Sequence, residues 1–422
     1  MRKIFLLLAL SVAMMAVAQK VSTIITCPGE DASNTMRISW AADGKGTKLM
    51  YRPATDAGWK KAVRLRPETE FRCVTFDSIY SKGADNSDIY EYPAITKCGA
   101  TIKHLSPDTR YEYVITDGDD RWLSEVHSFV TAGKDSWTCC VISDFHSYTP
   151  LKHRQTDAMA MIDAVKAYKP FDWVLHLGDI TAWGGSWSFW ESLYAERYFT
   201  DYMWAGVNGN HDNMTRGFAR TSNDFFRQAN YYPENGYLGE DGVCYHFRYG
   251  EVMFVMLNSE DMRKWEGFDA AEKWVEKVVT EARNAADAPR YVVVCEHYQW
   301  FDGVNGKDSQ YARWCDTFDR LGIDLALAGN NHIYVRTDAI YDGATTDGSR
   351  GTVYIQTPSS DNERGRYMKD ITDNQHLIKY RWAEGPNMVG AMSMSVDSER
   401  MVLTLLDRYG NTLDTAIVKA KR

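Results

Sequence analysis

The sequence predicts a mixed α/β protein in which an all-β module precedes a larger α/β domain. Between residues 20 and 132, apolar and polar residues alternate with a period of two and no helical period occurs, which is typical of half-buried strands. Beyond residue 136, continuous apolar runs alternate with helical segments, the pattern of an α/β domain. The short polar segment 133–136 separates the two patterns, so we expect domains over 19–133 and 134–422.

The composition indicates a globular protein without a nucleic-acid partner. Of the 422 residues, 44% are hydrophobic and 25% are charged, which is enough apolar surface for a core. The formal net charge is -9, whereas proteins that bind nucleic acid by neutralising phosphates carry an excess of basic residues.

Residues 1–18 are predicted to be a signal peptide. Arg2 and Lys3 precede an apolar run over residues 4–15, and Ala16 and Ala18 offer a small-x-small cleavage site. A membrane span needs about 20 apolar residues, so this run is too short to remain as an anchor. We therefore expect an exported protein with no stable membrane anchor, either periplasmic or secreted to the cell surface.

The eight cysteines do not form a zinc motif, because no Cys-x-x-Cys pair exists. Cys139, Cys140 and Cys295 lie in strand-like apolar runs, which favours buried free thiols. Export permits disulfides, and a bridge among the three early cysteines, Cys27, Cys73 and Cys98, remains an open alternative.

The N-terminal module resembles a fibronectin type III-like sandwich. Alternation at Met36, Ile38 and Trp40 and the Leu-x-Pro-x-Thr-x-Tyr run over residues 105–111 carry the resemblance. That run places Tyr111 where such sandwiches pin a corner through a hydroxyl hydrogen bond. The module is interpreted as a spacer or support, with a binding module as the alternative.

In the second domain, five apolar segments each end in residues that can bind a metal. The expected strands over 137–143, 171–177, 204–207, 290–295 and 323–328 alternate with expected helices such as 156–168 and 270–285. Open α/β sheets bind ligands beyond the carboxyl ends of their strands. The residues at those ends are Asp144 and His146; Asp179; Asn210, His211 and Asp212; His297; and Asn330, Asn331 and His332.

The residue types at these strand ends suit two hard or borderline cations. Carboxylate, imidazole and amide ligands favour manganese, iron or zinc over copper(I). Asp179 can bridge two ions because a carboxylate has two oxygens. Two such ions can hold a phosphoryl group between them and activate water near neutral pH.

The motif order Asp-x-His, Gly-Asp, Gly-Asn-His-Asp, His and Gly-x-x-His resembles the calcineurin-like dinuclear metallophosphoesterases, and the β-module in front resembles their purple acid phosphatase-like branch. The resemblance implies a four-layer αββα sandwich, with residues 351–357 and 392–418 as closing strands. It also implies site roles. Asp144, His146 and His332 hold the first metal, Asp179 bridges, Asn210 and His297 hold the second, His211 assists the leaving group, and Asp212 orients the His211 imidazole.

Three positions depart from the family pattern. Asn330 stands where the family has a histidine ligand of the second metal, and an amide oxygen is the weaker donor. Ala182 stands where purple enzymes have a tyrosine, so we expect no purple chromophore. His146 stands where purple enzymes have glycine, and it matches the wider superfamily instead.

Three further residues are predicted to contact the substrate. Trp183, Tyr298 and Asn331 are candidates because each lies close in sequence to a predicted ligand. Arg216 is interpreted as a surface residue and His176 as a packed core histidine. The mostly polar stretch over 361–376 is predicted to be a long loop near the mouth of the site.

The sequence thus predicts an exported phosphoric ester hydrolase that acts on a small-molecule phosphate ester. A metal-activated hydroxide would attack phosphorus while His211 assists departure of the alcohol. The branch implies a phosphomonoesterase. The alternatives are a phosphodiesterase of the same fold, or a non-catalytic surface or periplasmic binding protein whose second metal site has degenerated at Asn330.

Overall fold

The computed structural model describes residues 19–73, 80–82, 88–90, 95–134, 136–215, 223–301, 309–361, 363–367, 375–385 and 388–421. The predicted signal peptide, Arg216 and most of the stretch 362–374 lie outside these residues. Within them, no helix is both long and apolar enough to cross a membrane.

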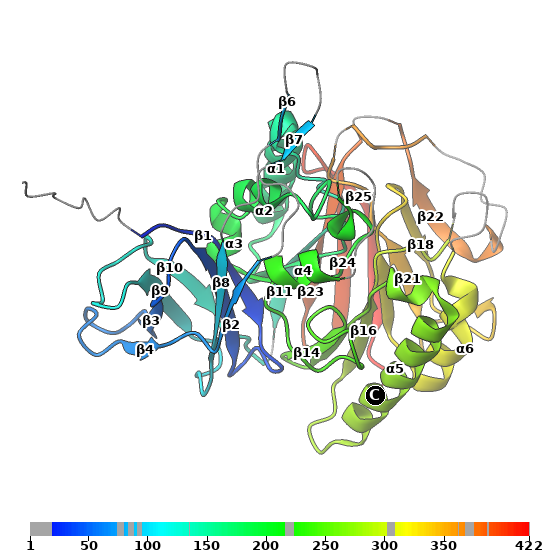
Figure 1. Cartoon of the computed structure of the whole chain (residues 1–422). Helices are drawn as coiled ribbons and strands as arrows, with labels where there is room; N and C mark the ends of the chain where they lie inside the picture. Colours follow the sequence, from blue (N-terminus) through cyan, green and yellow to red (C-terminus); the bar gives the residue numbers. More distant parts are fainter. Residues whose placement is uncertain are drawn as a thin grey trace, which may run out of the picture.

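Two large sheets lie face to face in the middle of the molecule (Figure 1). The first has the order β25-β24-β23-β11-β12-β13-β1-β2-β8-β5. Its strands are β1 (Val21–Pro28), β2 (Met36–Ala42), β5 (Thr69–Arg72), β8 (Thr96–Ile102), β11 (Trp137–Ile142), β12 (Trp173–His176), β13 (Met203–Gly206), β23 (Gly390–Val396), β24 (Arg400–Asp407) and β25 (Thr412–Lys419).

The second sheet has the order β14-β15-β16-β17-β21-β18-β22. Its strands are β14 (Tyr245–Tyr249), β15 (Val252–Met256), β16 (Tyr291–Cys295), β17 (Leu325–Ala328), β18 (Tyr334–Thr337), β21 (Val353–Gln356) and β22 (Ile378–Trp382). Aromatic rings fill the space between the sheets: the Trp173 ring of β12 lies 5.1 Å from that of Phe254 in β15. Burial of such large rings contributes a sizeable part of the core stability.

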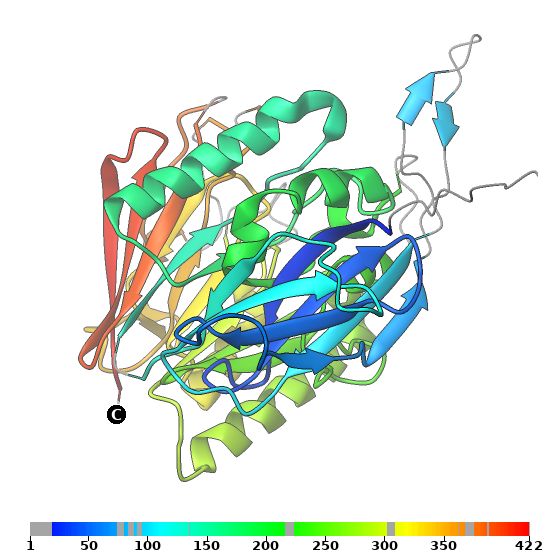
Figure 2. The ribbon, with the colours of Figure 1, turned by 90° about the vertical axis from the view of Figure 1, so that its left-hand side faces the viewer.

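Helices cover the outer faces of both sheets (Figures 1 and 2). Helix α1 (Lys152–Tyr168) buries Met161, Ile162 and Val165, whose spacing forms one helix face. Helices α5 (Trp265–Asn284) and α6 (Tyr311–Leu321) cover the other side, and the Phe268 and Trp314 rings join them at 4.9 Å. The predicted four-layer αββα arrangement and α/β class are therefore confirmed.

Shorter elements complete the chain. The short helices are α2 (Trp187–Leu193), α3 (Arg197–Asp201) and α4 (Asp224–Ala229), and the 3₁₀ turns are η1 (Thr149–Leu151), η2 (His211–Asn213), η3 (Asp261–Arg263) and η5 (Gln375–Leu377). Two small hairpins pair β6 (Tyr80–Lys82) with β7 (Asp88–Tyr90) and β19 (Ile340–Tyr341) with β20 (Ala344–Thr345).

The N-terminal strands join the first large sheet instead of forming a separate one. Strand β1 pairs in parallel with β13 through Thr26 and Met203. A four-stranded sheet, β10-β9-β3-β4, completes this region. It consists of β3 (Lys48–Pro53), β4 (Val63–Leu65), β9 (Arg110–Thr116) and β10 (His127–Val130). The hydroxyl of Tyr113 in β9 donates to the Thr200 carbonyl of α3 at 2.7 Å, which ties this sheet to the rest.

The predicted corner hydrogen bond is present: the Ser106 N–H donates to the Tyr111 hydroxyl at 2.9 Å. The fibronectin type III likeness and the boundary at residue 133 stay predictions. All eight cysteines are free thiols, and seven are buried. Buried thiols at Cys139, Cys140 and Cys295 are thus confirmed, and the structure forms no bridge among Cys27, Cys73 and Cys98.

Candidate metal centre

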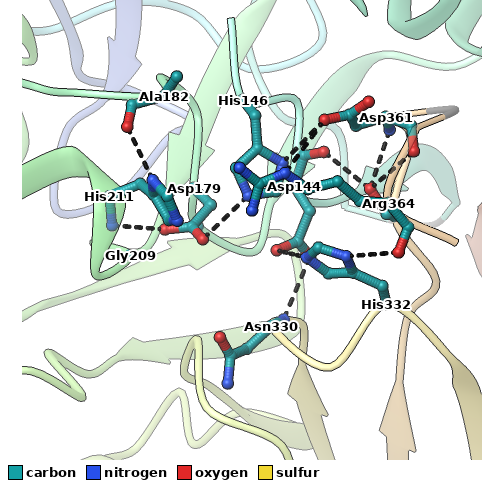
Figure 3. Close-up of polar contacts among 12 residues, drawn as sticks. Asp144, His146, Asp179, Ala182, Gly209, His211, Asn330, His332, Asp361 and Arg364 are labelled. Carbon is teal, nitrogen blue, oxygen red and sulfur yellow. Dashed lines mark hydrogen bonds and ion pairs between the residues drawn. The ribbon is translucent and has the colours of Figure 1, made fainter. Parts of the chain in front are cut away.

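The two large sheets bring the predicted strand ends together at one edge (Figure 3). Strands β11, β12 and β13 run parallel in the first sheet, and β15, β16 and β17 run parallel in the second. Their carboxyl ends therefore meet at the same edge, as open α/β sheets require. The residues that follow these strands are Asp144 and His146, Asp179, His211, His297 and His332.

Backbone strain is concentrated at this edge. Ten described non-glycine residues have a positive φ, and five of these ten are predicted metal ligands. Left-handed backbone costs about 1–3 kcal/mol for such residues and is found mostly where function requires it. The five residues are Asp144 (57°), His146 (45°), Asp179 (54°), Asn330 (66°) and His332 (58°).

Two glycines allow the ligand loops to approach one another. A Cβ on Gly178, whose φ is +92°, would lie 2.4 Å from Nδ1 of His297. A Cβ on Gly209 would lie 2.1 Å from the backbone nitrogen of Asp179. These contacts explain why Gly precedes Asp in one motif and Asn-His in the other.

Asp179 occupies the centre of the cluster. Its Oδ2 lies 3.2 Å from Nε2 of His146 and 3.3 Å from Nε2 of His297, and its Oδ1 accepts the His211 N–H at 2.8 Å. A carboxylate that contacts two imidazoles has the position required of a bridging ligand.

Asp144 and His332 form the second half of the cluster. Oδ1 of Asp144 lies 3.3 Å from Nε2 of His332, and Oδ2 accepts from the Ser143 hydroxyl at 2.6 Å and the Asn330 N–H at 3.1 Å. Three groups of potential ligand atoms each lie within 4.8 Å of one another. The groups are Asp144, His146 and His332; His146, Asp179 and His211; and Asp144, Asp179 and His297.

The donor set fits bound cations. Oδ1 of Asp144 and Nε2 of His297 are buried, and within the described residues neither has a hydrogen-bond partner. Burial alone would lower the pKa of His297, but the Asp179 carboxylate raises it to about 10. A cation at this point would replace the proton, because metal ligands must be deprotonated.

Backbone carbonyls orient the imidazoles. Nδ1 lies 2.7 Å from the Leu177 oxygen in His297, 2.9 Å from the Arg364 oxygen in His332, and 2.7 Å from the Ala182 oxygen in His211. An Nδ1–H that donates to a carbonyl leaves Nε2 free to bind a metal or substrate.

The predicted role of Asp212 is wrong. Its Oδ1 accepts the Thr181 N–H at 2.9 Å and its Oδ2 accepts the Gly209 N–H at 3.0 Å. The His211 imidazole is held by the Ala182 carbonyl instead. Asp212 follows His211 directly in the 3₁₀ turn η2, where its carboxylate faces the neighbouring loop, so it shapes the loop and does not orient the ring.

The two asparagine ligands stay predictions. Asn210 is half-buried and directly precedes η2. Nδ2 of Asn330 donates to Oε1 of Gln299 at 2.5 Å, and its amide points away from Asp144 and His332 in Figure 3. Gln299, which the sequence did not single out, therefore contacts the residue that stands where metallophosphoesterases of the resembling family have a histidine.

The three predicted substrate contacts lie on loops next to ligands. The half-buried Trp183 ring lies 5.2 Å from the Tyr148 ring, and Asn331 is 5% exposed. The half-buried Tyr298 donates its hydroxyl to Glu260. Substrate contact by all three stays a prediction.

His176 is a packed core histidine, as predicted. Its ring is fully buried 4.4 Å from the Phe145 ring, and its Nδ1 accepts the Gly178 N–H at 3.1 Å. Burial lowers its pKa to about 3, so the ring is neutral.

Sequence reasoning missed Asp361, Arg154 and Arg364. Asp361 is fully buried, and its Oδ2 lies 3.4 Å from Nδ1 of His146. The segment that begins there was predicted as a polar loop near the site, but a polar stretch gives no signal that one carboxylate in it is buried against a ligand.

Comparisons with known proteins agree with this geometry. Residues 138–334 match the calcineurin-like phosphoesterase family. A purple acid phosphatase from yellow lupin (Lupinus luteus) seeds has a similar fold, with a TM-score of 0.73 and 14% identity over 95% of this chain and 74% of that one. The structure of PhoD gives a TM-score of 0.58 and 13% identity over 94% of this chain and 88% of that one.

An uncharacterized protein of Mycobacterium tuberculosis is 26% identical over 198 residues, which are 43% of this chain and 36% of the relative. The matched part thus spans about a third of that relative's length. The family match covers the strand ends that carry Asp144, Asp179, His211, His297 and His332. The region of the chain that matches the calcineurin-like phosphoesterase family is therefore the one that carries the candidate metal centre.

Proposed function

We propose that this protein is an exported, metal-dependent hydrolase of small phosphomonoesters. The observation that carries the proposal is the Asp179 carboxylate, whose Oδ2 lies 3.2 Å from His146 and 3.3 Å from His297. Asp144 and His332 extend the same cluster on one side. This is a site for two neighbouring cations, which the phosphoesterase fold uses to act on phosphate esters.

The residues divide between two ions. Asp144, His146 and His332 would hold one, His297 and Asn210 the other, and Asp179 would serve both. Manganese, iron and zinc all suit this ligand set. When bound, two such cations neutralise phosphoryl charge and lower the pKa of bound water.

His211 is placed to handle the proton of the leaving group. Its Nδ1 is held by the Ala182 carbonyl at 2.7 Å, which leaves Nε2 free. Burial is the main cause that lowers the pKa of its imidazole to about 4. A bound phosphate anion favours the protonated ring, so Nε2 then carries a proton that it can give to the departing alcohol oxygen.

Export rests on the sequence of residues 1–18, and the cellular location that follows from it is the periplasm or the outside of the cell. The net charge of -9 supports a small-molecule substrate in preference to nucleic acid.

A non-catalytic binding protein is the second candidate. The contact between Asn330 and Gln299 favours it, because an amide held by a neighbouring side chain is a poorer ligand than the family's histidine. The intact set of Asp144, Asp179, His297 and His332 favours the hydrolase.

An assay of paired esters separates these functions. The metal-stripped full chain is given manganese, iron(II), zinc or no metal, and an aryl phosphate monoester and diester are compared. Metal-dependent turnover, faster for the monoester, is expected. His211→Ala should lower kcat about 100-fold or more, since general acid catalysis contributes about 10²–10⁴. The exposed His376→Ala serves as control. A folded protein without turnover under any metal would favour the binding protein.

A further inference from the structure

A strap after β21, residues 359–361 and 363–367, lies over the metal centre. The Ser359 hydroxyl donates to the Asp144 carbonyl at 3.0 Å, and the Ser360 N–H donates to the Ser143 carbonyl at 3.0 Å. The Arg364 carbonyl lies 2.9 Å from Nδ1 of His332. The strap is therefore fixed to two ligand loops, and its side chains have defined positions beside the cluster.

Arg364 directs its side chain toward the cluster. Its Nε lies 3.5 Å from Oδ2 of Asp361, and the same oxygen lies 3.4 Å from Nδ1 of His146. Figure 3 shows the side chain running from the strap toward His146. Burial is the main cause that lowers the pKa of His211, the Asp179 carboxylate opposes it, and the Arg364 charge adds a smaller lowering, so the guanidinium lies within electrostatic reach of that ring as well.

The guanidinium of Arg364 has N–H donors that can bind a ligand. Its side chain is 32% exposed, and its contact with Asp361 is made through Nε, at the base of the fork and not through the terminal nitrogens. Arg154 differs, because it is 11% exposed and donates from Nε and Nη2 to the Glu363 carboxylate at 3.0 and 2.7 Å. Arg154 thus anchors the strap, whereas the terminal nitrogens of Arg364 are placed to bind an anion.

We propose that Arg364 binds the non-bridging oxygens of the substrate phosphoryl group and thereby selects monoesters over diesters. This inference rests on the proposed function and specifies its substrate class. A guanidinium fork matches two oxygens of a phosphate at once. A monoester dianion offers three non-bridging oxygens, whereas a diester offers two and only one charge. If the cations hold one non-bridging oxygen, a monoester leaves two for the Arg364 fork, whereas a diester leaves only one.

The test uses the metal-loaded full chain and a pair of aryl esters with the same leaving group. Arg364→Gln should lower kcat/KM for the monoester about tenfold to a hundredfold, the range expected for hydrogen bonds to charged groups, and change the diester value less than threefold. Arg364→Lys should recover part of the loss. Arg366→Gln, two residues along the same strap and half-buried, should behave as wild type.

Calorimetric titration with inorganic phosphate gives a second readout. Phosphate should bind the metal-loaded Arg364→Gln protein at least about tenfold more weakly than wild type. Equal losses on both esters, the same loss in Arg366→Gln, or unchanged phosphate affinity would each overturn the role of Arg364. If wild type hydrolyses neither ester, the proposed function fails, and the phosphate titration then decides alone whether Arg364 binds an anion.

Discussion

At the scale of single residues, the metal centre is set up by backbone groups as much as by side chains. Carbonyls of Leu177, Ala182 and Arg364 each lie within hydrogen-bond distance of one imidazole Nδ1. A backbone carbonyl is present whatever side chain follows it, so these contacts fix ring orientation without leaving a mark in the sequence. The sequence motifs therefore predict which histidines lie in the site, but they do not predict which ring nitrogen of each histidine carries the proton.

Gly178 is the residue at which this packing can be tested. A Cβ there would lie 2.4 Å from Nδ1 of His297, so Gly178→Ala must displace that ring. We expect metal affinity to fall about 10-fold to 100-fold, as when other supports of metal ligands are removed. The measurement is calorimetric titration of the stripped protein with manganese and zinc.

Gly322→Ala is the matched control for that substitution. Gly322 also has a positive φ, +64°, but a Cβ there meets nothing within 4 Å. Gly322→Ala should lower the stability of the fold by about 1–2 kcal/mol, because alanine is disfavoured in a left-handed backbone conformation. It should leave metal affinity unchanged. Equal metal affinity in both variants would contradict the steric explanation.

At the scale of elements, the sequence predicted the strands that carry ligands and not how they are joined. Apolar runs ending at Asp144, Asp179 and His297 were predicted to within two residues of β11, β12 and β16, because strands covered on both faces read as continuous apolar runs. Helix α6 and the junction of β1 with β13 are findings of the structure. Pairing between strands depends on partners far along the chain, which periodicity does not encode.

The contact between β8 and α4 predicts a pH dependence of stability. Lys97 of β8 is buried, and its Nζ donates at 3.0 Å to the Ala229 carbonyl at the end of α4. Burial lowers its pKa from 10.5 to about 8, although the buried thiols of Cys73, Cys27 and Cys98 oppose this. Between those two pH values the unfolded chain holds a proton that the folded chain has lost. This group therefore raises the free energy of unfolding as pH rises, by about 3 kcal/mol at most.

Lys97→Met should remove this contribution. The difference in unfolding free energy between wild type and the variant should grow in favour of wild type from pH 7.5 to pH 10, as measured by urea denaturation. Tyrosines and cysteines that titrate in the same range are present in both proteins, so their contributions to the pH dependence cancel in the difference. Lys103→Met, at an exposed lysine just beyond the same strand, should show no such trend. If the difference in unfolding free energy stayed constant across this pH range, the pKa of Lys97 would not be lowered in the folded state.

At the scale of the whole molecule, the centre joins the two large sheets. Asp144 and Asp179 follow strands of the first sheet, whereas His297 and His332 follow strands of the second. Without cations these sheets are held by core packing, and buried carboxylates face imidazoles across the seam. Cations bound by both sides would connect the sheets directly, and binding to the folded state alone stabilises it by mass action.

We therefore expect metal to stabilise both sheets together. At about 1,000 times the dissociation constant, a cation adds about 4 kcal/mol to the free energy of unfolding. Hydrogen exchange of the metal-loaded protein should slow at β11 and β12 and equally at β16 and β17, relative to the stripped protein. Asp179→Asn, which weakens the shared ligand, should lose most of this protection on both sides. Protection confined to one sheet would show that the cation is held by that sheet alone, and that the centre does not join the two halves of the fold.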